Sequence, residues 1–331
     1  MATLGSSYLN LADRLKRTEA GEQAATIIEM MNETNCIMQD ANVLECNDGS
    51  NYISTIRTGL PVATFRRLYG FVAPSKSTTA QVKDPTGMLE AFSVVDKDLV
   101  DKAKNPKLFR LSESTPFIEA MNQTMQTEVF YGNTKTKPEG FDGLAVRYGK
   151  KATDKKRIGY NIIDAGGTGS DNTSIWFVTW GDQHCSLTYP EGSKAGIQHE
   201  DDGIQTETDS NGGKRKVYQD HYKMDAGLTL RDWRSTCRIA NIDVSDLASA
   251  SAADLVDLMR QAYYKVNRYA AGGKTIIYCN SNTLMYFDKQ VESKTNIHFS
   301  YQEYLGKKVL TFRGLPIREC DQILETETQV S

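Results

Sequence analysis

The chain has 331 residues, of which 39% are hydrophobic and 24% charged, and its formal net charge is -3. This length exceeds what one hydrophobic core usually supports, and the composition excludes wholesale disorder, so two or more packed subdomains are expected. The near-neutral charge argues against nucleic acid or an anionic membrane surface as the main partner.

The cysteines predict a protein with reduced thiols that is made in the cytosol. They are scattered, form no CxxC pair and follow no secretion signal; they are Cys36, Cys46, Cys185, Cys237, Cys279 and Cys320. No window approaches the ~18 consecutive apolar residues that a membrane-spanning helix needs.

The N-terminal region predicts two short helices, because apolar residues recur at helical spacing on either side of Gly21. They are Leu11 and Leu15 before the glycine, and Ala24, Ile27, Ile28 and Met31 after it. Residues 51–57 alternate apolar and polar ahead of Gly59-Leu60-Pro61, which predicts a strand that runs into a bend.

The pattern from Pro61 to about Lys104 predicts a long hairpin, with a strand at 63–74, a polar tip at 75–87 and a second strand at 88–100. Such a hairpin is marginal alone, so its apolar side chains need another surface. They are Phe65, Leu68, Phe71, Val72, Leu89, Phe92 and Val94. Two alternatives stay open, a neighbouring subunit or the chain's own domain.

The clearest helix is expected at 115–131, with Thr115 as its cap and Pro116 in its first turn. Its apolar residues repeat every four positions and predict core packing rather than a ligand surface; they are Phe117, Met121, Met125 and Val129.

Residues 148–223 predict a loop-rich β region around one buried strand at 174–180. A capped helix is expected from Ser251, with Asp254 three residues later and an apolar face of Leu255, Leu258, Met259, Ala262 and Val266. A strand at 274–279, a helix at 281–291 and a strand pair at 308–312 and 315–318 complete the prediction.

Three short motifs resemble a P-loop, a dinucleotide-binding loop and a zinc site, but none of them matches its pattern. Gly272-Gly273-Lys274-Thr275 lacks the first P-loop glycine, since position 268 is Arg, and it leads into a predicted strand, whereas a P-loop leads into a helix. Gly166-Gly167-Thr168-Gly169 does not fit GxGxxG. The pair His184-Cys185 has no second half that would complete a zinc site. The sequence therefore predicts no catalytic residue, cofactor or metal.

Two basic stretches are interpreted as solvated loops. Lys150-Lys151 with Lys155-Lys156-Arg157, and Lys214-Arg215-Lys216, are flanked by acidic residues and lack interleaved aromatics. Nucleic-acid patches usually have such aromatics or extend along one face.

Four stretches carry a resemblance to a known family. Residues 59–99, 108–133 (LFRLSESTPFIEAMNQTMQTEVFYGN), 139–149 (EGFDGLAVRYG) and 176–192 (WFVTWGDQHCSLTYPEG) resemble major capsid proteins of epsilon15-like and Bordetella podophages. The elements at 277–280 and 313–317 are similar to those of many HK97-like capsid subunits.

This resemblance implies an α+β subunit with the HK97-like phage capsid fold. It implies an N-terminal arm at 1–55, an extended loop at 56–107, a peripheral domain at 108–149 and 300–331 with a spine helix at 115–131, and a mainly axial domain at 150–299. Hexamers and pentamers of the subunit would form an icosahedral shell around a double-stranded DNA phage genome. The arm residues Leu11 and Leu15 would join the seven hairpin side chains in contacts between subunits.

The resemblance also implies partners and a location. They are a cement protein, a portal protein, a scaffolding protein during assembly, and packaged DNA held by weak non-specific contacts, in a virion assembled in the host bacterial cytoplasm. Lys76 and Lys83 are expected to form no covalent crosslink. The alternatives are an encapsulin-like compartment shell, or an enzyme. The enzyme would use the Trp176–His184 region together with an acidic loop around His199, with Glu200, Asp201 and Asp202, as a pocket.

Overall fold

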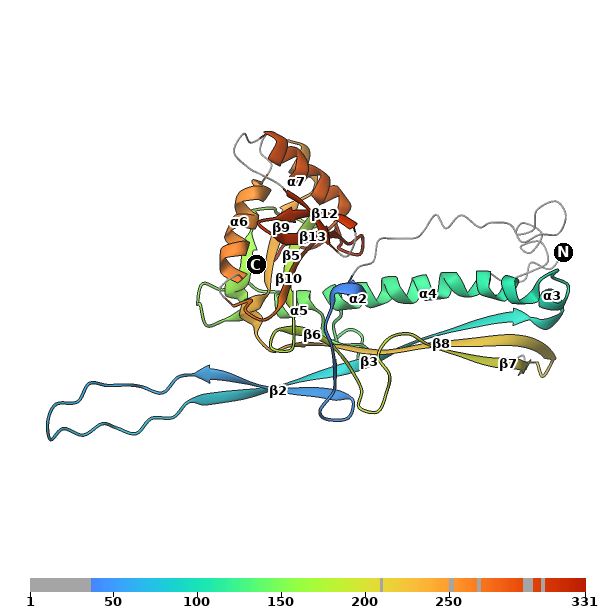
Figure 1. The fold of residues 1–331 in the computed structure, drawn as a ribbon, viewed down its shortest axis with the longest axis horizontal. Coiled ribbons are helices and arrows are strands. Elements are labelled where there is room, and N and C mark those ends of the chain that lie inside the picture. The colour runs from blue at the N-terminus through green and yellow to red at the C-terminus, as the bar shows by residue number, and fades with distance from the viewer. Residues whose placement is uncertain (1–36, 209–210, 250–252, 267–268, 294–299, 305–306) are drawn as a thin grey trace. The chain divides into compact units, whose positions relative to one another are not determined.

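A computed structural model describes residues 37–331 apart from 209–210, 250–252, 267–268, 294–299 and 305–306 (Figure 1). The helices expected around Gly21, with Leu11 and Leu15, lie outside these ranges. The described chain forms two compact units. Unit 1 contains residues 88–126 and 194–225, and unit 2 contains residues 37–87, 127–193 and 226–331.

The centre of unit 2 is strand β5 (Asn172–Trp180), in which every residue is buried. It pairs antiparallel with β9 (Cys237–Asp243) and with β10 (Lys274–Cys279). An unbroken apolar run suits a strand covered on both faces, and the buried strand expected at 174–180 is confirmed. The strand expected at 274–279 is confirmed as β10.

Further strands extend this sheet on both sides. β4 lies parallel to β9, β13 lies parallel to β10, and β12 joins β13 to β11. β6 pairs antiparallel with the last residues of β8 and parallel with β1. The bounds are β1 (Val43–Glu45), β4 (Ile162–Asp164), β6 (Cys185–Tyr189), β8 (Lys214–Leu230), β11 (Ser300–Tyr304), β12 (Lys307–Phe312) and β13 (Leu315–Glu319).

The expected C-terminal strand pair is confirmed as β12 and β13. Arg313 and Gly314 form its two-residue turn, with φ angles of 52° and 81°. Positive φ at both central positions is the geometry that matches the twist of a hairpin.

The helices of unit 2 pack beside the sheet (Figure 1). They are α2 (Ile37–Asp40), α5 (Leu144–Arg147), α6 (Leu255–Val266) and α7 (Ser281–Ser293), with 3-10 turns at Ile158–Asn161, Trp233–Ser235 and Ser245–Ala248. α6 and α7 share one hydrophobic core with β5, β9 and β10. The helix expected at 281–291 is confirmed as α7.

The start of α6 differs from the prediction. Ser251 lies outside the described ranges, and the helix begins at Leu255. The Asp254 carboxylate accepts a hydrogen bond of 3.1 Å from the Asp257 amide, so Asp254 is the cap rather than an interior residue.

Unit 1 contains a hairpin that the sequence did not predict. β7 (Gln198–Thr208) pairs antiparallel with β8. Lys214-Arg215-Lys216 and the acidic residues after His199 therefore lie on strands and not in loops. The reason is that the hairpin exposes most of β7, so charged side chains occupy strand positions and pair across it, as Glu207 and Arg215 do at 2.6 Å.

The long helix α4 (Pro106–Tyr131) begins nine residues before the position expected at Thr115. Asn105 caps it by accepting a hydrogen bond from the Leu108 amide. Thr115 instead donates back to the Leu111 carbonyl at 3.2 Å. The interior Pro116 costs the helix about 3 kcal/mol, which burial of residues on either side, such as Phe109 and Met121, offsets.

The hairpin expected between residues 61 and 104 also differs from the prediction. β2 (Asn51–Gly59) pairs antiparallel with residues 78–85 of β3 (Thr78–Asp96), so residues 60–77 form the loop between them. The strand expected at 63–74 is absent from this described region, because its apolar side chains have nothing to pack on and prolines stand at 61 and 74. The second strand ends at Asp96, which caps helix α3 (Lys97–Asp101).

None of the helices in the described ranges combines the length and hydropathy of a transmembrane span.

Two cysteines of the core are expected to be unreactive. Burial raises the pKa of the Cys185 thiol to about 12 and that of Cys237 to about 12. At pH 8 the thiolate fraction should therefore be about a thousandfold below that of a free cysteine. We expect iodoacetamide to leave both unmodified in the folded protein and to alkylate both in urea, as measured by peptide mass spectrometry. Rapid labelling of either residue in the folded protein would contradict the described core.

Candidate functional site

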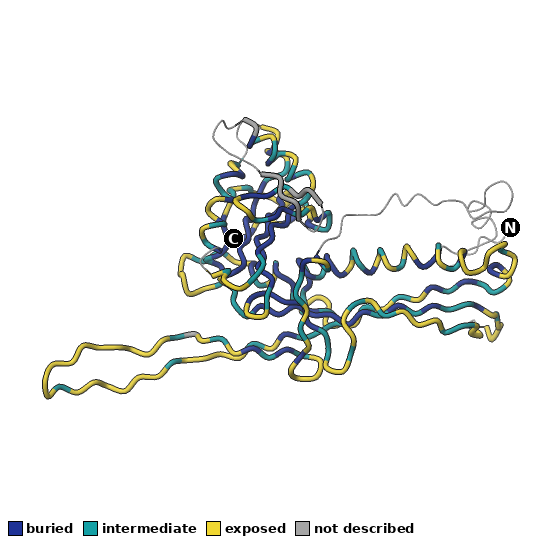
Figure 2. The backbone as a smooth tube through the Cα atoms, in the orientation of Figure 1, coloured by how far each residue is buried: buried dark blue, intermediate teal, exposed yellow. Residues whose placement is uncertain are grey.

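The loop at residues 60–77 is exposed along most of its length (Figure 2). It carries several large apolar side chains. Phe65 and Phe71 are completely exposed, at 109% and 102% of their reference areas. The exposed large hydrophobic residues of the loop are Leu60, Val62, Phe65, Leu68, Tyr69, Phe71 and Val72. Contiguous exposed apolar surface of this kind marks a site for a protein partner.

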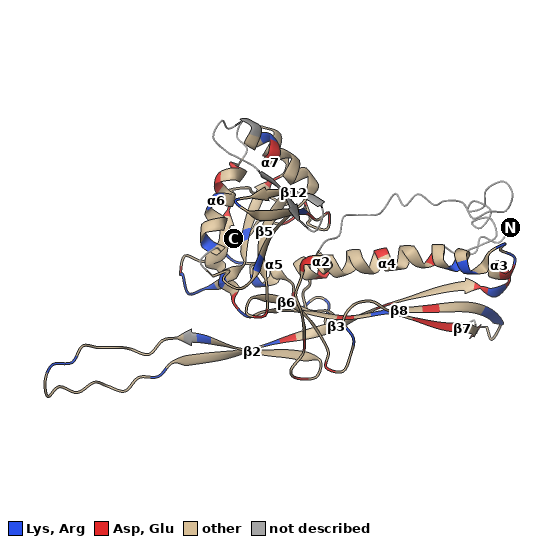
Figure 3. Cartoon of the chain, in the orientation of Figure 1, with Lys and Arg blue, Asp and Glu red and all other residues tan. Residues whose placement is uncertain are grey.

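The same region is basic (Figure 3). Between Asp48 and Asp84 the sequence contains no acidic residue. The basic residues there are Arg57, Arg66, Arg67, Lys76 and Lys83. A surface that covers this loop must therefore be apolar and supply negative charge or carbonyl groups around it.

Few internal contacts hold the loop. The Ser75 hydroxyl bonds the Val62 amide at 3.1 Å and the Val62 carbonyl at 3.0 Å. A turn closes where the Gly70 amide donates to the Arg67 carbonyl at 3.0 Å, with Tyr69 at φ 61°. A segment held by so few bonds can adapt its shape to a partner.

The base of the hairpin, in contrast, is anchored by buried Asp84. Its carboxylate accepts hydrogen bonds from Arg147 at 3.0 Å and from the Thr229 hydroxyl at 2.8 Å. Arg147 also donates to the Leu228 carbonyl at 2.9 Å. This network ties β2 and β3 to α5 and to the end of β8, so unit 2 presents the loop from a fixed base.

The hairpin residues predicted as contacts separate into two groups. Phe65, Leu68, Phe71 and Val72 all lie in the exposed loop. Leu89, Phe92 and Val94 lie in the part of β3 that belongs to unit 1. Phe92 is partly exposed and stacks on His221 with ring centroids 4.4 Å apart, whereas Leu89 and Val94 are half-buried. Leu11 and Leu15 lie outside the described residues.

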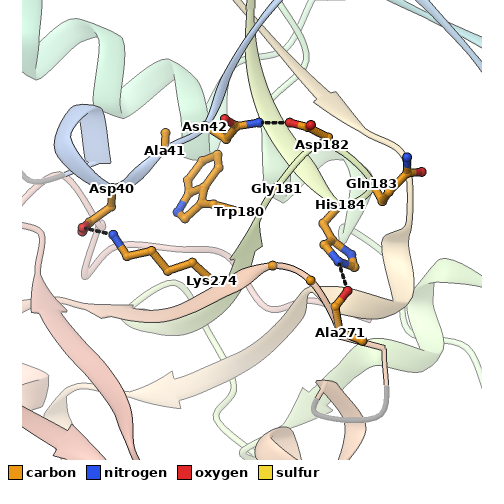
Figure 4. Close-up of a pocket in the computed structure, with 12 residues that line it drawn as sticks. Asp40, Ala41, Asn42, Trp180, Gly181, Asp182, Gln183, His184, Ala271 and Lys274 are labelled. Carbon is orange, nitrogen blue, oxygen red and sulfur yellow. Dashed lines mark hydrogen bonds and ion pairs between the residues drawn. The ribbon is translucent and has the colours of Figure 1, made fainter.

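A polar pocket of about 640 Å³ opens in unit 2 (Figure 4). It is lined by residues 40–42, 180–184 and 271–274. Trp176, at the start of the region proposed for an enzyme pocket, does not line it and is fully buried in β5. His199 belongs to unit 1.

The charged groups of the pocket are largely paired with one another. The buried Asp40 carboxylate is bound by Lys274 at 3.0 Å and by Arg318 at 3.1 Å. The Asn42 side chain donates to Asp182 at 2.5 Å, and a ring nitrogen of His184 lies 3.1 Å from the Ala271 carbonyl (Figure 4). The two Asp40 ion pairs hold α2 against β10 and β13, so these charges serve the fold.

Neither glycine motif forms a phosphate-binding loop in the described chain. Lys274 begins β10 rather than a helix, and Gly166 and Gly169 form a turn with φ angles of 93° and 92° before β5. Within the described ranges no group of three or more His, Cys, Asp or Glu side chains could hold a metal ion.

A family model and a solved structure that match this chain both belong to phage capsid proteins. The family model of major capsid protein GP7 matches residues 18–331. A chain from the near-atomic structure of bacteriophage epsilon15 matches with a TM-score of 0.79 and 36% identity, over 100% of this chain and 99% of that chain. Comparison with curated proteins found no match.

Two more distant structures also match. The capsid of bacteriophage JBD30 has a TM-score of 0.49 and 11% identity, over 89% of this chain and 93% of that one. The SrpI encapsulin of Synechococcus elongatus has a TM-score of 0.44 and 9% identity, over 72% of this chain and 96% of that one. These two likenesses are too distant to bear on function.

The resemblance to epsilon15-like capsid proteins and the HK97-like α+β fold are confirmed by the full-length match at 36% identity. The family model covers all but the first 17 residues of the chain. The chain therefore belongs to the family of the major capsid protein GP7.

Proposed function

We propose that this capsid protein assembles into hexamers and pentamers that close into an icosahedral shell around a double-stranded DNA phage genome. The observation that carries the proposal is the loop at 60–77, whose exposed apolar side chains have no surface to cover them within unit 2. A neighbouring subunit would bury Phe65, Leu68, Phe71 and Val72, and burial of each such side chain contributes about 1.5–3 kcal/mol.

Finer assignments extend the same proposal. The arm at 1–55, the extended loop at 56–107, the peripheral domain and the axial domain remain predictions, and so do contacts through Leu89, Phe92, Val94, Leu11 and Leu15. A cement protein, a portal protein and a scaffolding protein are the proposed partners, and assembly in the host cytoplasm is the proposed route to the virion. The role is structural, without catalysis, which the internally paired charges of the pocket support.

The test is to express the chain alone, separate it by size-exclusion chromatography at several concentrations and image the fractions by negative-stain electron microscopy. We expect closed shells, sheets, or rings of five and six subunits, with larger species at higher concentration. A monomer at every concentration, combined with enzymatic turnover, would contradict the proposal.

A further inference from the structure

Positive charge is concentrated in the exposed loop at residues 150–157, which belongs to unit 2. This stretch, KKATDKKR, contains one acidic residue, Asp154, among its lysines and arginine, whereas the whole chain has a net charge of -3. A local excess of one charge on a nearly neutral protein is a candidate surface for an oppositely charged partner. We call residues 150–157 the basic loop. Its exposed cations are Lys150, Lys155, Lys156 and Arg157.

The four exposed cations have no partner within the part of the chain that the structure describes. None of their side chains makes an ion pair or a hydrogen bond with another described residue. Lys151, in contrast, is paired with Asp164 at 2.5 Å. In the other basic stretch, Lys214-Arg215-Lys216, the central arginine is paired with Glu207 on the neighbouring strand β7. The charge of the basic loop therefore remains available to a partner, and that of the second stretch is partly neutralised within its own hairpin.

Backbone contacts fix the shape of the basic loop. The Ala152 amide donates to the Gly159 carbonyl at 3.2 Å and closes the base of the loop. At the tip, the Arg157 amide donates to the Asp154 carbonyl at 3.0 Å, and the Lys156 amide donates to the Asp154 carboxylate at 3.0 Å. The two lysines between these turn ends are held at the tip of the loop, so little backbone order has to be gained on binding.

The composition of the basic loop indicates which kind of anion it fits. Ala152 is its only apolar residue, whereas interfaces between proteins are usually anchored by buried apolar or aromatic side chains. The loop also contains no aromatic ring on which the bases of a single strand could stack. The ring of nearby Tyr160 is covered by Lys265, whose ammonium lies 4.6 Å from the ring centre. These features favour the phosphate backbone of a duplex, which is bound through positive charge alone.

The size of the basic loop also suits a duplex. The seven steps from Lys150 to Arg157 span at most about 25 Å, which is less than one turn of B-DNA at about 34 Å. A duplex carries one negative charge per ~1.7 Å of its axis, so each exposed cation finds phosphates within its reach. Contacts with phosphates carry no sequence information, and a container for a genome must accept every sequence in it.

We propose that the basic loop binds packaged double-stranded DNA through its phosphate backbone. This inference rests on the proposed function, because the assembled shell is what brings the subunit and the DNA together. Four phosphate contacts give weak, salt-sensitive binding, with a dissociation constant on the order of 10⁻⁴ M for one subunit at physiological salt. Repeated over many subunits, such contacts hold the DNA against the shell and still allow it to move during packaging and release.

Fluorescence anisotropy of a labelled duplex of about three helical turns tests the proposal. The probe is titrated with the full chain in its unassembled form, which size-exclusion chromatography isolates. We expect a slope of log K against log salt concentration of about -3.6, which is 0.9 for each of four contacts. Lys155→Gln with Lys156→Gln should reduce the size of this slope by about 2 and weaken binding roughly tenfold or more at low salt.

A second double variant removes the same charge elsewhere and is the matched control. Lys214→Gln with Lys216→Gln also replaces two exposed lysines, but on strand β8 of unit 1. It should change the affinity for the duplex by less than about twofold, because these lysines make no contact with the DNA. Equal losses in the two double variants, or no binding of the duplex by the parent chain, would overturn the proposal.

Polyglutamate with the same number of charges as the duplex tests the other class of partner. Tighter binding to polyglutamate than to the duplex would assign the basic loop to an acidic protein and would also overturn the proposal. Weaker binding to polyglutamate supports a site for the phosphate backbone.

Electron microscopy separates this inference from the proposed function. The variant Lys155→Gln with Lys156→Gln should form shells as the parent does, because neither side chain has a partner among the described residues. Shells from the parent without binding of the duplex would refute the inference and leave the proposed function intact. Absence of shells from the parent at every concentration would instead count against the proposed function.

Discussion

Replacing Glu327 by Ala is expected to destabilise unit 2 by about 3–5 kcal/mol, because it leaves the buried Arg238 guanidinium without its counter-charge. Both side chains are only 4% exposed, and their charged groups lie 2.9 Å apart. Glu327 also accepts hydrogen bonds from the Ser174 and Tyr131 hydroxyls. Each of these donors would lose its partner in the variant.

The pair also fixes the C-terminal segment on the central strand. Glu327 and Asn172 exchange backbone hydrogen bonds of 2.8 and 3.3 Å, and Arg238 donates to the Tyr148 carbonyl at 2.9 Å. Burial, with the Glu327 carboxylate beside it, raises the pKa of the Tyr131 phenol well above its ordinary value. Tyr131 therefore stays protonated and remains a donor.

Urea unfolding followed by tryptophan fluorescence measures this effect, since Trp176, Trp180 and Trp233 all belong to unit 2. Asp257→Ala is the control: it removes an exposed carboxylate in the first turn of α6 that pairs with Arg260 at 3.5 Å and accepts a hydrogen bond from Gln261 at 2.9 Å. It should change stability by less than about 1 kcal/mol. The double variant Arg238→Met with Glu327→Leu should recover most of the loss, because it buries no charge. A loss below about 1 kcal/mol in Glu327→Ala would contradict the buried network.

The sequence predicted the elements whose patterns are set by burial. β5 and β10 each contain a run of four apolar residues, 175–178 and 276–279, and could be located to within a residue or two. The apolar face predicted for α6 was correct apart from the position of its cap. The residues of these elements pack into a core within one chain, so the spacing of their apolar residues in the sequence reflects which face is buried. Strand β7 has no buried residue, so its sequence carries no pattern set by burial.

The candidate site could be predicted only in part. Phe65 and Phe71 were predicted as contacts because a long hairpin buries little of its own surface, so its apolar side chains need another surface to cover them. Asp84 and Arg147 were missed, because a contact between residues 63 positions apart leaves no local signal. A lone Arg238 within the apolar strand β9 was the available hint of a buried ion pair, but its partner in the C-terminal segment could not be identified from spacing.

The double variant Phe65→Ser with Phe71→Ser is expected to abolish shell assembly while leaving the subunit folded. Both rings are fully exposed in the single chain. Their removal should therefore leave the free energy of unfolding of the subunit unchanged. In an assembled shell each ring would bury against a neighbour at about 1.5–3 kcal/mol, so the two together would weaken each contact by on the order of 10² to 10⁴.

Size-exclusion chromatography and electron microscopy at matched concentrations measure the assembly, and urea unfolding measures the fold. Tyr264→Ser, which removes an aromatic ring that is 56% exposed on α6, is the control and should assemble as the parent does. Normal shells from the double variant would show that the loop is not an assembly contact. A lowered unfolding midpoint would instead mean that Phe65 and Phe71 pack within the subunit, which the exposed loop at 60–77 argues against.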